Sequence, residues 1–381
     1  MPPQATSTPL FQELNFALIF TRGISLATWE SMGTLDREIK PYQEGAKRWK
    51  TVYLFTYGLG EAKKYQHMFP VNVKIISRPF FLPSFLYSFL MPCIHFRIFK
   101  HIAVVKTNQM DGSWTAVIAK KISKAKLVVR CGYEWLEFLE MTKRSVLKRS
   151  IASVVERYAY AHADKIMLTS YSAKDFVERR FSVPESKIAI IPNYIDTEKF
   201  APSVTYRQPG RVIFVGRLEK EKNLDNLILA VSGLSAELVL VGEGSLHSEL
   251  QRIAAKENVR VTFLGAIPQA RVIEELNKSE VFVLPSLYEG NPKALLEAMS
   301  CKLPCIGSKI SGIESILKDK ENGLLSGTDA DSIKQALKLL LADGKLRIHV
   351  EEGARSTIMD VFSFEKVFSK EMALYENLLK L

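Results

Sequence analysis

Short runs of apolar, β-prone residues recur along the whole chain, and most of them are continuous rather than alternating. They include NFALIFT from Asn15, IAVVK from Ile102, KLVVR from Lys126, RVIFV from Arg211 and VFVLP from Val281. Strands that are covered on both faces of a sheet give such continuous runs. Helical stretches separate several of them, so the order strand, helix, strand predicts a doubly wound α/β fold.

One segment interrupts this rhythm at residues 192–210, where prolines and polar residues replace the periodic pattern before the strands resume. The prolines are Pro192, Pro202 and Pro209. A length of 381 residues exceeds one ordinary domain. We therefore predict two tandem Rossmann-like domains, 1–200 and 201–360, that face a central cleft, with the ligand at the carboxyl ends of the strands.

The charge is spread unevenly between the two halves. Residues 1–200 hold 29 Lys and Arg against 17 Asp and Glu, whereas residues 201–381 hold 23 against 24. A basic half beside a neutral half predicts that the first half meets an anionic surface or substrate. Charge alone does not exclude nucleic acid, but no recognised nucleic-acid-binding motif accompanies it, and we expect no nucleic-acid partner.

The cysteines and histidines argue against a disulfide scaffold and against a protein-held metal. The four cysteines lie far apart without a C-x-x-C pair, and the six histidines show no ligand spacing. The first apolar run, Phe16 to Phe20, is too short for a signal-peptide core and lacks a basic region before it, so we interpret it as a strand. These features predict a cytoplasmic protein without a metal or another cofactor.

An uncharged, aromatic run extends from Pro79 to Phe96, between Arg78 and Arg97. We expect prolines within the run to break it, which favours a buried or partly buried domain helix. An aromatic surface that enters a membrane interface and a transmembrane span are the alternatives. Lys and Arg cluster at Thr142 to Arg149, so these two segments and the basic half together predict docking on an anionic membrane. The basic residues of that cluster are Lys143, Arg144, Lys148 and Arg149.

After the strand RVIFV the chain reads VGRLEKEKNLDNL. Gly216 allows the tight turn that leaves a buried strand, and Asn223 is a candidate N-cap for the next helix. Arg217 and Lys222 then stand at the carboxyl edge of the sheet, where the two cations could hold a diphosphate. The alternative is a solvated charge run in which both cations pair with the glutamates of the same segment.

After the strand VFVLP the chain reads SLYEGNPKALLEAMS. Asn291 and Pro292 predict an N-cap and a first helical residue. Lys293 in the first turn places a positive charge at the positive end of the helix dipole, which is unfavourable. A bound anion at that end would offset this cost. Backbone N–H groups at Gly290, Asn291 and Lys293 could bind sugar oxygens or phosphate.

Two carboxylates belong to the same segment, Glu289 in the loop and Glu297 inside the helix. Carboxylates can accept hydrogen bonds from sugar and ribose hydroxyls. The alternative makes Glu289 a loop charge and Glu297 a surface helix residue. A third turn, VGEGS from Val241, is only a weak dinucleotide fingerprint, because His247 stands where its last glycine would be.

In these segments the second half resembles the retaining glycosyltransferases of the group-1 class, which have the GT-B fold. The likeness covers roughly residues 150–381 and fades towards the N-terminus. The matching segments stand in family order: ADKIMLTSYSAKDF, IPNYIDTEKF, VGRLEKEKNL, LVGEG, VTFLGAIP, LPSLYEGNPKALLEAMSCKLPCIGS and ENGLLS. No single segment is decisive, but the ordered set is specific.

The resemblance implies roles for individual residues. Arg217 and Lys222 would neutralise the diphosphate of a nucleotide-sugar donor, without a metal. Glu289 and Glu297 would be the two glutamates of the family's E-x7-E motif, at the sugar and at the ribose. Arg217, Lys222 and Glu289 are the expected catalytic residues. The expected donor site comprises Gly216, Arg217, Lys222, Gly242, Leu264, Gly265, Glu289, Gly290, Asn291, Lys293 and Glu297.

The first half departs from the family pattern. Relatives often carry a glycine-rich turn after the first strand and a histidine after the strand that corresponds to KLVVR. Here the turn TRGISLAT has Gly23 alone, and the chain continues RCGYEWLEF without a histidine. We expect Gly23, Arg130, Tyr133 and Glu134 at the acceptor side of the cleft. For Tyr133 and Trp135, ordinary packing is the alternative.

The resulting hypothesis is a retaining, metal-independent hexosyltransferase-like enzyme of polysaccharide or cell-envelope biosynthesis. It would move a sugar from a nucleotide donor to a saccharide or lipid-linked acceptor held by domain 1–200. A C-terminal helix over 361–381 is expected to return to that domain, and the protein is expected in the cytoplasm, peripheral on the inner membrane face. The alternatives are a nucleotide-sugar epimerase or phosphorylase and a non-catalytic sugar-nucleotide binder.

Overall fold

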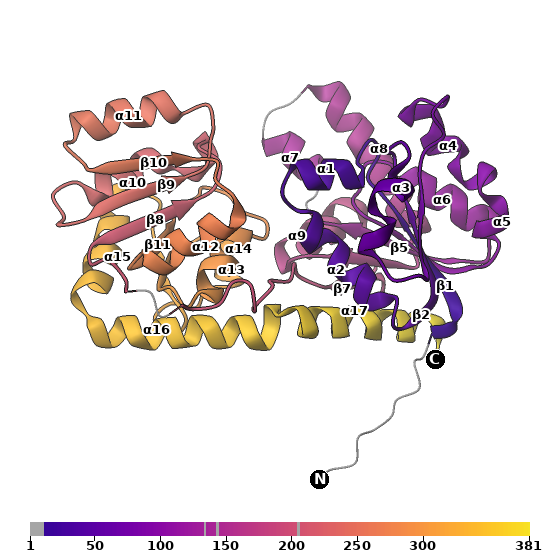
Figure 1. Cartoon of the computed structure of the whole chain (residues 1–381). Coiled ribbons are helices and arrows are strands. Elements are labelled where there is room, and N and C mark those ends of the chain that lie inside the picture. Colours follow the sequence, from indigo (N-terminus) through magenta and orange to yellow (C-terminus); the bar gives the residue numbers. More distant parts are fainter. Residues whose placement is uncertain (1–10, 133–134, 142–144, 204–205) are drawn as a thin grey trace, which may run out of the picture. The chain divides into compact units, whose positions relative to one another are not determined.

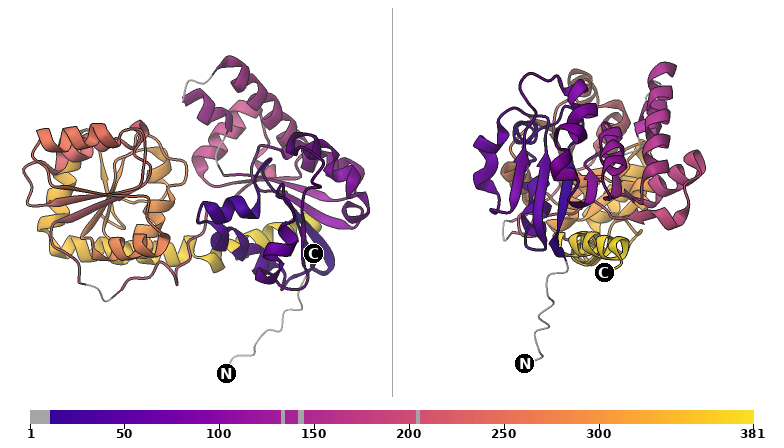
Figure 2. Two further views of the ribbon diagram at one scale, coloured as in Figure 1. Left: turned by 45° about the horizontal axis from the view of Figure 1, so that its top comes forward. Right: turned by 90° about the vertical axis from the view of Figure 1, so that its right-hand side faces the viewer.

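A computed structural model describes residues 11–132, 135–141, 145–203 and 206–381. The chain divides into two compact units, each built on a parallel sheet with helices on its faces (Figures 1 and 2). The first unit combines Met1–Ile191 with Phe368–Leu381, and the second unit is Pro192–Val367. The predicted class, two parallel α/β domains, is confirmed.

The sheet of the first unit has seven strands in the described residues, in the order β3-β2-β1-β4-β5-β6-β7, and every neighbouring pair is parallel. Strand order reverses between β1 and β4, which is where ligands bind in open sheets of this type. The strands are β1 Phe11–Ile19, β2 Trp49–Phe55, β3 Val73–Ile76, β4 Ile102–Thr107, β5 Lys126–Cys131, β6 Lys165–Leu168 and β7 Ile188–Ile190.

The helices of the first unit form layers on this sheet. The α6 helix packs against both α4 and α8, whereas Tyr375 of α17 packs its ring against Phe16 and Trp49. The helices are α1 Leu26–Ser31, α2 Leu35–Gly45, α3 Glu61–Tyr65, η1 Gln66–Met68, α4 Ser84–Ile94, α5 Phe96–Phe99, α6 Ser113–Ile122, α7 Trp135–Met141, α8 Val146–His162, α9 Tyr171–Phe181, η2 Glu185–Lys187 and α17 Phe364–Leu379.

The second unit has a six-stranded parallel sheet in the order β10-β9-β8-β11-β12-β13. Its strands are β8 Arg211–Val215, β9 Glu237–Val241, β10 Val261–Gly265, β11 Val281–Leu284, β12 Cys305–Ser308 and β13 Leu324–Ser326. Its helices are η3 Lys220–Lys222, α10 Leu224–Val231, α11 His247–Lys256, α12 Gln269–Lys278, α13 Lys293–Ser300, α14 Ser311–Glu314, α15 Ala330–Ala342, α16 Gly344–Thr357 and η4 Ile358–Phe362. Every residue of β11 and β12 is buried, as their continuous apolar sequences predict.

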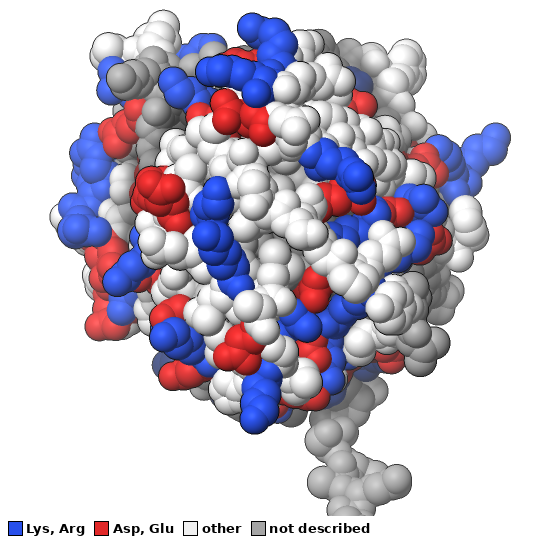
Figure 3. Space-filling model, turned by 90° about the vertical axis from the view of Figure 1, so that its left-hand side faces the viewer, with Lys and Arg blue, Asp and Glu red and all other residues white. Residues whose placement is uncertain are grey.

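The surface charge of the second unit is mixed. Figure 3 looks onto this unit, and its Lys and Arg side chains are interspersed with Asp and Glu among uncharged residues. This mixture agrees with the near balance of charges in residues 201–381. The second unit therefore does not offer a single-sign field on this face.

The predicted domain boundary after residue 200 lies nine residues too late. The second unit begins at Pro192, because Ile195 and Phe200 are buried in its core. The N–H of Ile195 also donates to the carbonyl oxygen of Phe362 at 2.8 Å. Hydrophobic burial of two side chains therefore holds part of the proline-containing segment in the second unit. Within α17, the division between the units falls at Phe368.

The aromatic run 79–96 contains a partly buried helix, α4, with Tyr87, Ser88, Met91 and Pro92 on its buried side. Pro83 stands at its N-terminal boundary, but the break that we expected at Pro92 is absent. Pro92 cannot donate to the carbonyl oxygen of Ser88, four residues earlier. The Thr115 hydroxyl of α6 donates to that oxygen instead. Of the described helices, none is long and apolar enough to span a membrane.

Candidate functional site

Glycines hold three loops of the second unit together at the carboxyl edge of its sheet. The N–H of Gly216, after β8, donates to the Val241 oxygen at 2.9 Å, and that of Gly242, after β9, donates to the Gly265 oxygen at 2.8 Å. Gly242 has φ 130°, and a Cβ there would lie 1.9 Å from the Gly216 oxygen. Only glycine fits this position, so the backbone itself forms this wall of the site.

Arg217 and Lys222, which follow Gly216, have different surroundings. The Arg217 side chain is 67% exposed, and its Nη2 lies 2.8 Å from an Oε1 of Glu221. Lys222 has only 14% of its side chain exposed, and its Nζ lies 2.5 Å from Oε1 of Glu289. Arg217 therefore pairs with a glutamate of its own segment, as the alternative predicted. Lys222 instead pairs with Glu289 in the loop after β11.

The ion pair of Lys222 and Glu289 is a fixed feature of this edge. The Ser286 hydroxyl donates to the same Glu289 oxygen at 2.7 Å, and the N–H of Leu287 donates to the Glu221 oxygen at 2.8 Å. Only 11% of the Glu289 side chain is exposed. Because both charges are largely removed from water, each one depends on its partner. A cation and an anion are therefore held side by side where β8 and β11 end.

Asn223 occupies the N-cap position of α10, as predicted, but its side chain does not cap the helix. Its backbone is left-handed, with φ 58° and ψ 38°. The Nδ2 group donates to the oxygens of Pro285 at 3.0 Å and Thr328 at 2.7 Å. Asn223 therefore ties the loop after β8 to the loops after β11 and β13. The tolerance of asparagine for left-handed backbone was the signal in the sequence.

Helix α13 begins one residue later than predicted, with Pro292 at the N-cap position and Lys293 as the first helical residue. Asn291 precedes the cap, and its Oδ1 accepts from Asn193 Nδ2 at 3.2 Å. Lys293 and Glu297 stand four residues apart, so they share one side of the helix. A Cβ on Gly290 would meet no heavy atom within 4 Å, so this backbone is open to a ligand.

The expected acceptor residues of the first unit are only partly described. Gly23 has φ 79°, which its turn requires. Arg130 is the next-to-last residue of β5, and its Nη1 lies 3.4 Å from the backbone oxygen of Asn108. Tyr133 and Glu134 lie outside the described residues. Trp135 begins α7.

Glu156, which we did not predict, is a buried carboxylate beside these residues. Its Oε1 accepts from the N–H groups of Trp135 at 2.8 Å and Leu136 at 3.3 Å, so it caps the start of α7. Burial raises the pKa of Glu156 to about 7. The sequence could have indicated that Glu156 is buried, because helical spacing places it on the same side of α8 as Ala152, Ala159 and Tyr160, which are also buried.

Glu156→Gln should stabilise the first unit at pH 8 but not at pH 4.5. The raised pKa means that the fold prefers the protonated acid, so the cost of ionisation develops as the pH rises from about 4.5 towards 7 and reaches ~3 kcal/mol at most. Glutamine keeps an oxygen for the two N–H groups without a charge. All four tryptophans belong to the first unit, so urea unfolding followed by tryptophan fluorescence measures it selectively. Equal effects at both pH values would contradict the assignment.

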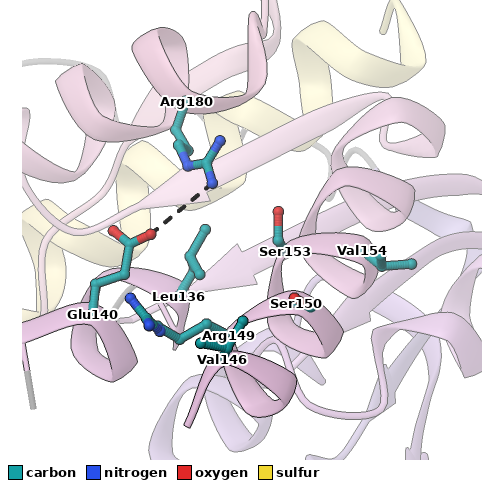
Figure 4. Close-up of a pocket in the computed structure, with 8 residues that line it drawn as sticks. All are labelled: Leu136, Glu140, Val146, Arg149, Ser150, Ser153, Val154 and Arg180. Atoms are coloured by element: carbon teal, nitrogen blue, oxygen red, sulfur yellow. Dashed lines mark ion pairs between the residues drawn. The ribbon is translucent and has the colours of Figure 1, made fainter. Parts of the chain in front are cut away.

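A hollow of about 440 Å³ lies among α7, α8 and α9 of the first unit (Figure 4). We call it the α8 hollow. Arg180 extends from α9 towards Glu140 of α7, with 4.0 Å between Nη2 and Oε1. The Nε of Arg149 is buried and has no hydrogen-bond partner among the described residues. The lining residues are Leu136, Glu140, Val146, Arg149, Ser150, Ser153, Val154 and Arg180. The hollow thus combines apolar side chains, two arginines, two serine hydroxyls and one carboxylate.

Metal ligands do not gather in the part of the chain that the structure describes. No group of three or more His, Cys, Asp or Glu side chains there could hold an ion. Cys301 and Cys305 are free and buried. Burial raises the pKa of the Cys301 thiol to about 12, which suits packing rather than reactivity.

Comparisons with known proteins match both halves of the chain. Residues 196–357 match the family "Glycosyl transferases group 1", and residues 44–199 match "Glycosyltransferase Family 4". An Escherichia coli UDP-Gal:alpha-D-GlcNAc-diphosphoundecaprenol alpha-1,3-galactosyltransferase is 30% identical over 71% of this chain and 74% of its own length. A Campylobacter jejuni N-acetyl-D-galactosaminyltransferase that acts on a diphosphoundecaprenol-linked saccharide is 27% identical over 66% and 68%.

Solved structures of the GT-B fold match nearly the whole chain. Anabaena HepE in complex with UDP has a TM-score of 0.75 and 17% identity, with 97% of this chain and 100% of that chain covered. Sucrose-phosphate synthase from Thermosynechococcus elongatus has a TM-score of 0.74 and 19% identity, with 96% and 99% covered. At such identities the likeness shows the fold.

Proposed function

Because this chain belongs to the group-1 glycosyltransferases, we propose that it transfers a sugar from a nucleoside diphosphate sugar to a lipid-linked saccharide, with retention of anomeric configuration. The observation that carries the proposal is the ion pair of Lys222 and Glu289 at the carboxyl edge of the second sheet. We propose that this cation binds the diphosphate of an activated sugar and that this anion accepts hydrogen bonds from the hydroxyl groups of the sugar.

In this proposal the cations of the second unit bind the donor diphosphate. Lys222 is held in place by Glu289, and the exposed Arg217 exchanges Glu221 for a phosphate oxygen. The glycines let the loops pack closely, because a Cβ at Gly216 would meet the Phe214 ring and one at Gly242 the Gly216 oxygen. The nucleotide is proposed to bind beside these loops. Leu264 and Gly265 of the adjoining β10 lie at the position proposed for the base.

The proposed roles of the two glutamates are those that the resemblance implies, and their places are compatible with them. Glu289 stands in the loop, with Ser286 and Lys222 on its Oε1, and would accept hydrogen bonds from sugar hydroxyls. Glu297 stands one turn inside α13 and would accept from the ribose. The proposed donor site also includes the backbone N–H groups of Gly290, Asn291 and Lys293, which lie between the two glutamates in the sequence.

Catalysis would consist chiefly of stabilising the charge that develops on the leaving diphosphate. The acceptor hydroxyl attacks from the face that the diphosphate leaves, and the leaving phosphate oxygen takes the proton of that hydroxyl. The bond from the anomeric carbon to the acceptor oxygen forms as the bond to the phosphate oxygen breaks. Lys222 and Arg217 hold the negative charge throughout, so this mechanism needs neither a metal ion nor an enzymic base.

The relatives support the proposed substrates. The E. coli relative is named for UDP-Gal and a diphosphoundecaprenol-linked acceptor, and HepE was solved with UDP, with UDP and glucose, and with UDP-glucose. We therefore propose a UDP-sugar as donor. Gly23 and Arg130, together with Tyr133 and Glu134, are proposed to contact the acceptor.

Thermal unfolding with a panel of UDP-sugars should identify the donor, and a transfer assay with a diphosphoundecaprenol-linked saccharide should follow. A ligand at 100 times its dissociation constant adds ~2.7 kcal/mol of stability. NMR of the product should show the anomeric configuration of the donor, and turnover should continue in EDTA because Arg217 and Lys222 neutralise the diphosphate. An inverted product would contradict retention, and an absolute, restorable requirement for Mg²⁺ or Mn²⁺ would contradict the metal-independent mechanism.

A further inference from the structure

Large apolar side chains cover one side of α4 and the loop before it. Phe80 is 84% exposed, Phe81 68% and Phe85 56%, although a phenylalanine ordinarily lies in a core. Five more exposed apolar side chains follow in the same segment: Leu86, Phe89, Leu90, Ile94 and Phe96. A contiguous apolar surface of this kind marks an interaction site. We call these eight residues the α4 surface.

A second apolar surface lies on the first turns of α8. Val146, Leu147 and Val154 are each about 70% exposed, and Ile151 is half-exposed. Val146 and Val154 also line the α8 hollow, where Arg149 carries a buried Nε without a partner in the described residues. An apolar rim around an arginine is suited to a molecule that has both a hydrocarbon part and an anionic group.

The two surfaces belong to one layer of the first unit. The α6 helix packs against α4 on one side and against α8 on the other (Figure 1). Trp114 of α6 stacks on Phe89 of α4 with 5.6 Å between the ring centroids. The layer is therefore continuous from α4 through α6 to α8.

Most charged side chains of this layer are basic. Neither α4, α5 nor α6 contains an Asp or Glu, and α8 contains none before Glu156. The Lys and Arg residues of these segments are Arg97, Lys120, Lys121, Lys148 and Arg149. Lys120 pairs with Asp164. Glu156, the acidic residue of α8, is buried. Exposed aromatic side chains within a mainly basic layer complement a surface that is apolar below and anionic at its boundary.

We propose that the α4–α6–α8 layer docks this protein on an anionic lipid bilayer. The aromatic side chains of the α4 surface enter the boundary between headgroups and acyl chains, while Arg149 at the α8 hollow and the exposed Lys148 next to it in sequence bind lipid phosphates. This inference rests on the first unit alone and is independent of the transfer chemistry. Docking would present the first unit to acceptors that lie in the plane of the membrane.

Co-sedimentation tests the proposal with vesicles of phosphatidylcholine alone and with vesicles that contain equal parts of phosphatidylglycerol. The wild-type chain should partition at least tenfold more strongly onto the anionic vesicles, and high salt should release most of it. Phe80→Ser with Phe81→Ser, and separately Lys148→Glu with Arg149→Glu, should each reduce partition at least tenfold. Phe80, Phe81 and Lys148 are exposed, and Arg149 is partly buried.

Matched controls come from the second unit. Ile348→Ser removes an apolar side chain that is 59% exposed, and Lys256→Glu reverses a charge on a side chain that is 83% exposed. Both controls should partition like the wild type. Circular dichroism and UDP-dependent thermal stabilisation confirm that each variant is folded, whatever its membrane binding.

Three results would overturn the proposal. They are recovery of the wild type in the supernatant with every vesicle, equal partition onto neutral and anionic vesicles, and wild-type partition of the Phe80 and Phe81 variant. Retained stabilisation by UDP alongside any of these results would leave the proposed transfer function standing. Vesicle binding without stabilisation of the wild type by UDP would support the membrane proposal and contradict the proposed transfer function.

Discussion

Replacing Lys222 with alanine should slow sugar transfer by ~10² or more, because a preorganised donor to the charge that develops on the diphosphate is removed. Lys222 lies 2.5 Å from Glu289 and only 14% of its side chain is exposed, so its ammonium group is held at this edge of the sheet. The affinity for UDP should fall as well. Steady-state kinetics with the donor identified by thermal shift, together with UDP titration, measure both effects.

Lys220→Ala provides the matched control for this prediction. Lys220 is exposed in the same 3₁₀ turn, and its removal changes the net charge by the same amount. It should leave both turnover and UDP affinity within a factor of about three. If Lys222→Ala also keeps turnover and UDP affinity within threefold of wild type, Lys222 does not bind the diphosphate.

Removing the carboxylate of Glu371 should destabilise the first unit by ~3–5 kcal/mol, the usual cost of leaving a buried charge without its partner. Lys106 of β4 is only 3% exposed, and its Nζ lies 2.6 Å from Oε1 of Glu371 in α17. The Tyr375 hydroxyl donates to the same oxygen at 2.5 Å. Glu371→Ala therefore leaves a buried ammonium group and a buried hydroxyl without this acceptor.

The destabilisation by Glu371→Ala should also depend on pH. Burial alone would raise the pKa of Glu371, but the charge of Lys106 and the hydrogen bonds from Lys106 and Tyr375 lower it below its usual value. A lowered pKa contributes stability above the pKa of the unfolded chain, and this stability is lost as the pH falls through the folded value. Urea unfolding followed by tryptophan fluorescence should thus show a smaller difference at pH 3 than at pH 7.

Glu376→Ala, on the same helix, is the control. Glu376 is half-buried and lies about one and a half turns of α17 after Glu371, the partner of Lys106. It should change the free energy of unfolding by less than about 1 kcal/mol. A loss below about 1 kcal/mol for Glu371→Ala would mean that Lys106 finds another partner or becomes neutral.

The sequence was sufficient to predict the fold class, because buried parallel strands leave continuous apolar runs such as VFVLP. It was less informative about partners distant along the chain. Lys222 was interpreted as pairing with a neighbouring glutamate or with phosphate, whereas its partner is Glu289, on another loop. A local pattern cannot show which loops the parallel topology brings to the same edge.

The sequence also could not show which sides of helices are covered. The run 79–96 is apolar all round, so its periodicity did not separate the packed Tyr87 and Met91 from the exposed phenylalanines. Pro92 predicted a break, but Thr115 of another helix satisfies the carbonyl oxygen that the proline leaves unpaired. In both cases tertiary packing decided the outcome.

The first unit is completed by a segment that is synthesised only after the whole second unit. Strand β7 ends at Ile190, but Glu371 and Tyr375, the partners that surround the Lys106 ammonium, follow only after the whole second unit. At ~5–20 residues per second, synthesis of the intervening chain takes roughly 10–40 s. Until Glu371 and Tyr375 are made, the Lys106 ammonium lacks these partners, and this interval is the time in which the second unit, Pro192–Val367, is itself synthesised.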